Sequence, residues 1–168
     1  MADTPLTDTD AKAEFWKSLK HSNTGMLGLD RPGYHSQPMT GFSQDNDGRI
    51  WFFSRDDSDL AGDVAGSGQS AMFTYQSKDQ EVFACIHGQL SADHDRAKID
   101  EFWNPVVAAW FPDGKEDPHL TLLRFDGADG QIWLAKSGPV KFAYEIVKAN
   151  ITDTTPDIGG TAKVDLGR

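Results

Sequence analysis

The hydrophobic and polar positions of the chain change period several times, and each change marks an expected element. Between residues 8 and 21, Phe15, Trp16 and Leu19 fall on one side of a helix, and the preceding threonine and aspartate residues are typical of a helix start. After Thr24 the period shortens to that of strands. We expect seven strands, over residues 24–30, 35–44, 49–55, 70–76, 81–91, 121–125 and 131–135.

Two of these strands have a clear facial pattern. In residues 81–91, Val82, Ala84 and Ile86 fall at every second position, as in a strand with two different faces. The strand over residues 49–55 instead holds four apolar residues in succession. That pattern is typical of a strand covered on both faces.

The segment after the fifth strand predicts two short helices. Asp93 is expected to cap the first, whose apolar stripe contains Phe102 and Trp103. Asn104 and Pro105 are then typical of an N-cap followed by proline in the first helical position, because proline lacks the N–H that a helix interior needs. Further helices are expected over residues 59–65 and 140–148.

The strand pattern favours one domain over residues 1–150. Strands connected mostly by hairpins, with one helical insertion, indicate a mainly β antiparallel barrel or sandwich. Residues 126–130 are expected to form the turn between the last two strands. Residues 151–168 are polar and include two adjacent glycines, so an extended polar tail is expected there.

The charge of the chain excludes several partner classes. Its formal net charge is -10, without a cluster of basic residues, so nucleic acid and anionic membrane surfaces are not expected as partners. Cys85 is the single cysteine, which rules out an intrachain disulfide. The N-terminus is polar and no apolar run approaches the ~20 residues of a membrane helix, so a cytoplasmic protein is expected.

Motifs for nucleophilic catalysis, phosphate loops or metal binding are weak in this sequence. The five histidines are scattered, and no metal site is expected. Aromatic residues are the stronger signal. Trp103 and Trp110 lie seven positions apart in the helical insertion, a placement that suits either a subunit contact or the wall of a site for a flat ligand.

Several of these residues together resemble a known family. The most specific are the runs 95–99, 103–105, 110–115, 117–118 and 122–125, joined by Pro38-Met39-Thr40 and by the aromatic strand 51–54. In these residues the chain resembles the general stress protein 26 branch of the pyridoxamine 5′-phosphate oxidase-like, FMN-binding split barrels. The resemblance covers about residues 13–150.

The resemblance implies a six- or seven-stranded antiparallel split barrel that forms a homodimer. It implies FMN, or FAD, in sites at the subunit interface, with the tryptophan-bearing insertion closing each site from the other subunit. The cofactor-binding residues it suggests are Gln37, Pro38, Met39, Thr40, Phe52, Phe53, Ser54, Arg55, Ser58, Trp103 and Trp110. No catalytic side chain stands out.

Two positions depart from the family pattern. Many relatives have an arginine before the Pro-Met pair and a lysine after the third strand, where this chain has Gln37 and Asp59 with Leu60. Both basic residues normally hold the flavin phosphate. Arg55 is the nearest basic substitute, and Ser58 with the following helix start offers N–H donors.

Two functions follow from the resemblance. One is a flavin-dependent oxidoreductase of unknown substrate within a stress-protein family. The other is a non-enzymatic dimeric stress protein that binds FMN, FAD or another aromatic ligand without turnover. Oxidation of pyridoxamine phosphate itself is not expected, because the chain lacks the basic C-terminal cluster of the true oxidases.

Overall fold

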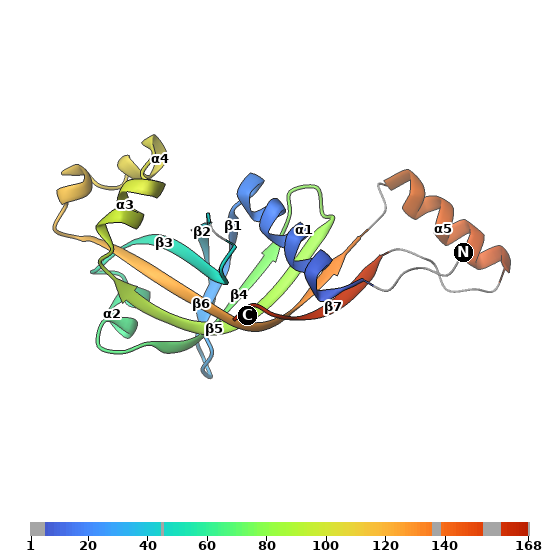
Figure 1. Ribbon diagram of the computed structural model, residues 1–168, viewed down its shortest axis with the longest axis horizontal. Coiled ribbons are helices and arrows are strands. Elements are labelled where there is room, and N and C mark those ends of the chain that lie inside the picture. Colours follow the sequence, from blue (N-terminus) through green and yellow to red (C-terminus); the bar gives the residue numbers. More distant parts are fainter. Residues whose placement is uncertain (1–5, 45, 136–138, 153–158, 168) are drawn as a thin grey trace.

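The computed structural model describes residues 6–44, 46–135, 139–152 and 159–167, and its described strands form one antiparallel sheet (Figure 1). Its strands are β1 Thr24–Leu29, β2 Gln37–Phe42, β3 Arg49–Arg55, β4 Gln69–Gln76, β5 Val82–Asp93, β6 Leu120–Leu134 and β7 Gly160–Asp165. The helices are α1 Asp8–His21, α2 Asp59–Val64, α3 Arg96–Phe102, α4 Pro105–Ala108 and α5 Pro139–Thr152, with a short 3-10 helix, η1, at Gly114–Glu116.

Six of the described strands close into a barrel. Their order is β3-β2-β1-β4-β5-β6, and the pairing of β3 with β6 joins the two ends. This closure confirms the predicted mainly β, antiparallel barrel. It also pairs β3 with β6, but within the described residues β2 keeps an unpaired edge before Gly41, where β3 is not beside it.

The long strand β6 organises this barrel. One edge pairs with β5 from Leu122 to Leu134, and the opposite edge is shared by β3 and β7. β3 lies beside residues 120–126, and β7 lies beside residues 129–134. The strand therefore belongs to the barrel in its first half and to a three-stranded extension in its second half.

The prediction of two strands separated by a turn at residues 126–130 is wrong, because β6 continues through this segment. Its glycines serve close backbone approach instead of a turn. A Cβ at Gly130 would lie 2.6 Å from the Cys85 carbonyl oxygen, and one at Gly88 on β5 would lie 2.2 Å from the Asp126 carbonyl oxygen. The register of β5 and β6 shifts beside Gly88, as at a β-bulge.

The predicted polar tail also needs correction. Residues 160–165 form β7, which pairs with β6 from Asp129↔Asp165 to Leu134↔Gly160. Ala162, Val164 and Leu166 are buried, while the residues between them are exposed. A strand of two or three small apolar positions, placed after two glycines, gives only a weak sequence signal.

The barrel interior is an aromatic and aliphatic core that α1 covers (Figure 1). Phe15 of α1 is fully buried, and its ring lies 5.7 Å from that of Tyr75 on β4. The Tyr75 hydroxyl and the Ser18 hydroxyl lie 2.9 Å apart in a hydrogen bond. Thr7 caps α1 by accepting the N–H of Asp10, so the predicted helix 8–21 is confirmed with its start.

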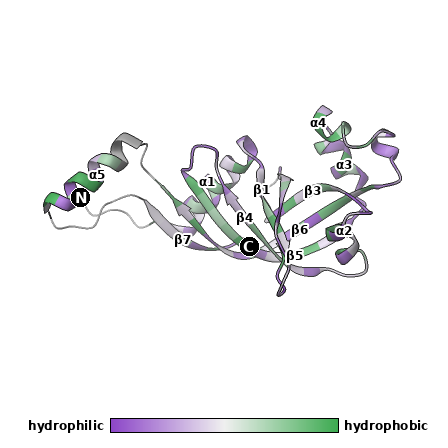
Figure 2. Ribbon diagram, turned by 180° about the vertical axis from the view of Figure 1, so that it is seen from behind, coloured by the Kyte–Doolittle hydropathy of each residue, from purple (hydrophilic) through white to green (hydrophobic). Residues whose placement is uncertain are grey.

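Strand β3 separates this interior from a second apolar cluster. Ile50 and Phe52 face the barrel core, whereas Trp51 and Phe53 belong to a cluster with α3 on the outside. The prediction that this strand is covered on both faces is therefore confirmed. Figure 2 shows apolar and polar residues interspersed along the strands and along α3 and α4.

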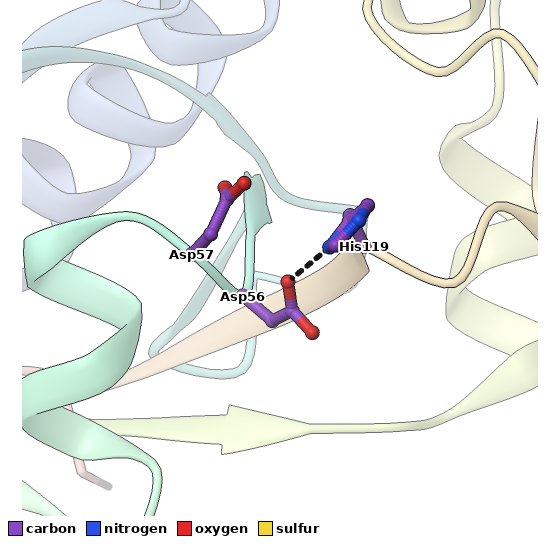
Figure 3. Close-up of side chains that lie close together, drawn as sticks. All are labelled: Asp56, Asp57 and His119. Carbon is purple, nitrogen blue, oxygen red and sulfur yellow. Dashed lines mark hydrogen bonds and ion pairs between the residues drawn. The ribbon is translucent and has the colours of Figure 1, made fainter.

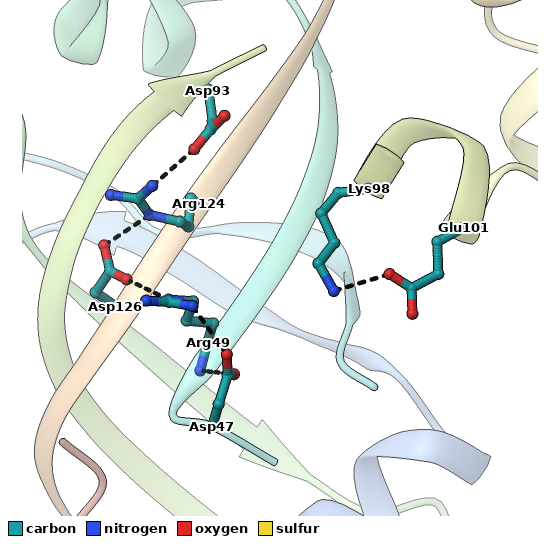
Figure 4. A network of polar contacts seen from close by, with 7 residues as sticks. All are labelled: Asp47, Arg49, Asp93, Lys98, Glu101, Arg124 and Asp126. Carbon is teal, nitrogen blue, oxygen red and sulfur yellow. Dashed lines mark hydrogen bonds and ion pairs between the residues drawn. The ribbon is translucent and has the colours of Figure 1, made fainter. Parts of the chain in front are cut away.

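Helices α3 and α4 stand at one end of the molecule and α5 at the other (Figure 1). Asp95, not the predicted Asp93, caps α3, because its carboxylate accepts the N–H groups of Ala97 and Lys98. Asp93 ends β5 and pairs with Arg124 at 2.8 Å. Figure 4 shows this pair within a chain of contacts that continues through Asp126 to Arg49 and connects β3, β5 and β6.

Of the described helices, none combines the length and apolar character needed to cross a membrane.

Candidate functional site

A cavity of about 520 Å³ lies between β2, β3 and the segment that contains α4. β2 contributes Pro38 to Thr40, and β3 contributes Phe53 to Arg55. The helical segment contributes Asn104, Val106, Val107, Trp110 and Phe111, and Asn23 and Phe42 also line the cavity. The cavity therefore lies where the outer wall of the barrel meets the insertion.

An open backbone edge forms one side of the cavity. β2 pairs with β1 from Gln37 to Thr40, but with β3 only at Gly41 and Phe42. Within the described chain, the edge of β2 before Gly41 has no strand beside it. An unpaired strand edge presents N–H and C=O groups, so the cavity has backbone donors and acceptors on this side.

Aromatic rings from three parts of the chain form much of the remaining lining. The Phe53 ring lies 5.7 Å from that of Phe42 in an edge-on arrangement and 6.5 Å from that of Phe111. Trp110 is 71% exposed at the rim of the cavity. A flat apolar ligand would meet aromatic edges and faces here.

Asn104 fixes the position of α4 at the cavity. Its side-chain oxygen accepts the N–H groups of Val106 and Val107 at 2.9 and 3.1 Å, and Pro105 follows in the first turn. The predicted N-cap and proline arrangement is confirmed. The cap sets where Val106 and Val107 line the cavity.

Arg55 brings charge to the end of β3. Its guanidinium makes two contacts with Asp57, from Nε to Oδ1 and from Nη2 to Oδ2, both at 3.0 Å. The hydrogen bond to Asp57 raises the pKa of Arg55, and the same bond lowers the pKa of Asp57. Among the described residues that line the cavity, Arg55 is the only one with an ionisable side chain.

Comparison with known proteins assigns the chain to a family. The family described as "Pyridoxamine 5'-phosphate oxidase like" matches residues 10–157. The chain belongs to the pyridoxamine 5′-phosphate oxidase-like family. Its barrel is the fold expected of this family, so the predicted split-barrel resemblance is confirmed.

Solved structures of this family include several close relatives of the chain. A candidate general stress protein 26 from Jannaschia sp. CCS1 is 39% identical, with a TM-score of 0.84 over 94% of this chain and 99% of the other. The general stress FMN/FAD binding protein from Xanthomonas citri is 43% identical, with a TM-score of 0.71 over 77% of this chain and 92% of the other. No curated protein matches the chain significantly.

The structure brings most of the predicted site residues of this family member together. Pro38, Met39, Thr40, Phe53, Ser54, Arg55 and Trp110 all line the cavity. The resemblance implied that the tryptophan-bearing segment closes a site from a second subunit. In this structure, the segment that contains Trp110 lines the cavity of its own chain.

The other predicted site residues do not line the cavity. Phe52 is fully buried on the opposite face of β3, with its ring 5.6 Å from that of Phe73. Gln37 begins β2 and donates a hydrogen bond to the Met39 sulfur. Ser58 caps α2 and bonds the Ser54 hydroxyl. Trp103 packs behind the lining rings Phe53 and Phe111, which it supports.

Several lining residues were not predicted as site residues. Asn23, Phe42, Asn104, Val106, Val107 and Phe111 belong to this group. The hydrophobic pattern of β3 did predict part of this arrangement. A strand that is apolar on both faces needs another element to pack on its outer face. The residues that cover it follow only from the tertiary position of α4.

A group of possible metal ligands lies beside the site. The side-chain ligand atoms of Asp56, Asp57 and His119 all lie within 4.8 Å of one another, and all three residues are exposed (Figure 3). Asp56 and the His119 ring are 2.8 Å apart, and Asp57 is held by Arg55. A cation would therefore have to displace existing protein contacts.

Proposed function

We propose that the cavity between β2, β3 and α4 binds a flavin, FMN or FAD. The observation that carries this proposal is a cavity that combines aromatic side chains with an open strand edge. An isoalloxazine ring has two apolar faces and a rim of hydrogen-bonding atoms. Aromatic side chains suit its faces, and the backbone groups of β2 suit its rim.

The size and lining of the cavity fit such a ligand. Its volume of about 520 Å³ lies inside the range of roughly 300–1,000 Å³ typical of small-molecule sites. The lining is mainly apolar, with few polar groups. A site of this kind orients a ring by a small number of directed hydrogen bonds.

The relatives support the same ligand class. The Xanthomonas citri protein, 43% identical to this chain, is a general stress FMN/FAD binding protein. This identity over 92% of that chain supports the same class of ligand for the present chain. It does not identify a substrate. We therefore propose a flavin-binding member of the general stress group.

Bound flavin would supply hydride and electron transfer. This chain's residues would hold the ring, limit its contact with water and fix its orientation. Arg55 is the only ionisable residue among the described lining, so the cavity contributes no carboxylate or imidazole for proton transfer. Turnover as an oxidoreductase thus depends on a substrate or a further subunit that brings such a group.

Titration of FMN and FAD into the purified protein tests the proposal. We expect saturable quenching of flavin fluorescence and a shifted visible absorption band. Addition of NADH or NADPH under anaerobic conditions then separates the two functions, because bleaching of the bound flavin supports an oxidoreductase and an unchanged spectrum supports binding without turnover. Absence of saturable binding to either flavin would contradict the proposal.

A homodimer is part of the proposal. Val106 and Trp110 near the cavity are 73% and 71% exposed, and α5 exposes Tyr144, Val147 and Ile151. These α5 residues follow the three- and four-residue spacing of one helix face. Contiguous apolar surfaces of this kind are typical of protein contacts, and sedimentation of the protein at several concentrations measures the assembly.

A further inference from the structure

The charges around Arg55 are unusual for a site that holds a phosphorylated ligand. Arg55 is the only ionisable residue among the described cavity lining, so it is the side chain available there to meet an anionic group. Its positive charge is surrounded by the carboxylates of Asp56, Asp57 and Asp117, each of which interacts with it. The local balance around this one cation is therefore negative.

The fork between Arg55 and Asp57 uses the same donors that a phosphate would use. Both hydrogen bonds measure 3.0 Å and run in parallel from Nε and one terminal nitrogen to the two carboxylate oxygens. Carboxylate and phosphate both bind a guanidinium in this two-point geometry. A phosphate at the same nitrogens must displace Asp57 and then lie near its charge.

We propose that Asp57 competes with the ligand's phosphate monoester for Arg55, so that this pocket recognises the flavin ring and discriminates weakly between phosphorylated and unphosphorylated flavins. This inference rests on the proposed flavin function and states which flavins the site would distinguish. The ring contributes its contacts with the aromatic wall and β2 in either case. The phosphate therefore adds little binding free energy, because the free energy of its contact with Arg55 is offset by the loss of the contact between Asp57 and Arg55.

The chain offers a matched control for this inference. Asp56 is adjacent, equally exposed and of the same charge, but its carboxylate bonds the His119 ring (Figure 3). Asp57→Asn and Asp56→Asn therefore change the net charge identically. Only Asp57→Asn removes the charged partner of the Arg55 fork.

The experiment measures dissociation constants of FMN and riboflavin, which differ by one phosphate, for four proteins. Wild type is expected to bind the two flavins with similar affinity. Asp57→Asn should tighten FMN binding by about threefold or more, which is the range of an exposed ion pair, and leave riboflavin unchanged. Asp56→Asn should shift FMN binding by a smaller factor. In the double variant Arg55→Gln with Asp57→Asn, the gain should vanish, because the cation that receives the phosphate is gone.

The outcomes separate this inference from the proposed function. If both flavins bind but the FMN-to-riboflavin ratio is unchanged by Asp57→Asn, or changes equally in Asp56→Asn, the competition at Arg55 is wrong and the flavin site stands. A strong preference of wild type for FMN would also overturn it. If neither flavin binds wild type or Asp57→Asn, the proposed function fails and this inference fails with it.

Discussion

The ring of Phe53 on β3 lies 5.9 Å from the ring of Trp103, which follows α3 in the chain. Trp103 also lies 6.2 Å from Phe111. One half-buried tryptophan thus contacts two rings that line the cavity from different elements. The barrel wall and the helical insertion are held together directly behind the proposed ligand site.

Replacement of Trp103 by alanine should weaken both the fold and the site. We expect a loss of about 2 kcal/mol in the free energy of unfolding, below the range for fully buried tryptophan, because the side chain is half-buried. Flavin affinity should fall as well, since Phe53 and Phe111 lose their common support. Urea unfolding measures the first effect. Trp103→Phe should retain most of both, and equal losses for the two variants would contradict the support role.

Replacement of Trp110 by alanine should act differently, because this residue is 71% exposed at the cavity rim. Flavin affinity should fall by about two- to tenfold, the effect of one aromatic contact, with little change in stability. Trp133 on β6 is the matched control, since it is 38% exposed and lies outside the described cavity lining. Fluorescence titration of both variants tests this, and an equal loss of affinity in Trp133→Ala would remove the specific role of Trp110.

The β4–β5 connection should make stability depend on pH at the acidic end. The Ser77 hydroxyl and the Glu81 N–H donate hydrogen bonds to Asp79, and they lower its pKa from the ordinary value of 3.8. The charged form is therefore favoured in the folded protein. Its contribution is present above pH 3.8 and is lost as the pH falls through the lower folded-state value.

Asp79→Asn measures this contribution. The variant should be less stable than wild type at neutral pH, and the difference should shrink in acid below the folded-state pKa of Asp79. Unfolding by urea at a series of pH values gives both curves. In a Ser77→Ala background the pH-dependent part should be smaller, and a difference between wild type and Asp79→Asn that stays constant with pH would refute the assignment.

The C-terminal strand should contribute to the stability of the barrel extension. Val164 is 4% exposed and faces the core, whereas Lys163 is exposed on the other face of β7. Val164→Asp should lower the free energy of unfolding by about 3 kcal/mol or more, because it buries a charge without a partner. Lys163→Asp should change it by about 0.5 kcal/mol or less. Equally small changes in the free energy of unfolding for both variants would contradict a stabilising role of β7 and would support the extended tail predicted from the sequence.

The sequence predicts the barrel better than it predicts the extension. β5 alternates between two different environments, and β3 is apolar on both faces, so the sequence pattern of each strand is clear and its bounds follow from that pattern. The segment around Gly127 and Gly130 carries turn-like residues, and its extended path depends on close contacts with β5 and β3 that are distant in sequence. Local preference cannot reveal such contacts.

The site divides in the same way. The resemblance points to Met39, Thr40 and Ser54, which line the cavity, but also to Phe52. Strand alternation places Phe52 and Phe53 on opposite faces, so both cannot line one cavity. The packing of the helical insertion on β3 determines that Phe53, not Phe52, faces outward. The sequence pattern of a single strand does not contain this information.

The most direct test of the flavin site is calorimetric titration of FMN into wild type, Thr40→Trp and Thr161→Trp. Thr40 is an exposed strand residue that lines the cavity, so a tryptophan there should fill it, while Thr161 is an exposed strand residue on β7 outside the described lining. We predict one saturable site in wild type and Thr161→Trp, and at least about tenfold weaker binding in Thr40→Trp, a difference of about 1.4 kcal/mol. Undiminished binding in Thr40→Trp, or no binding to wild type, would contradict a flavin site between β2, β3 and α4.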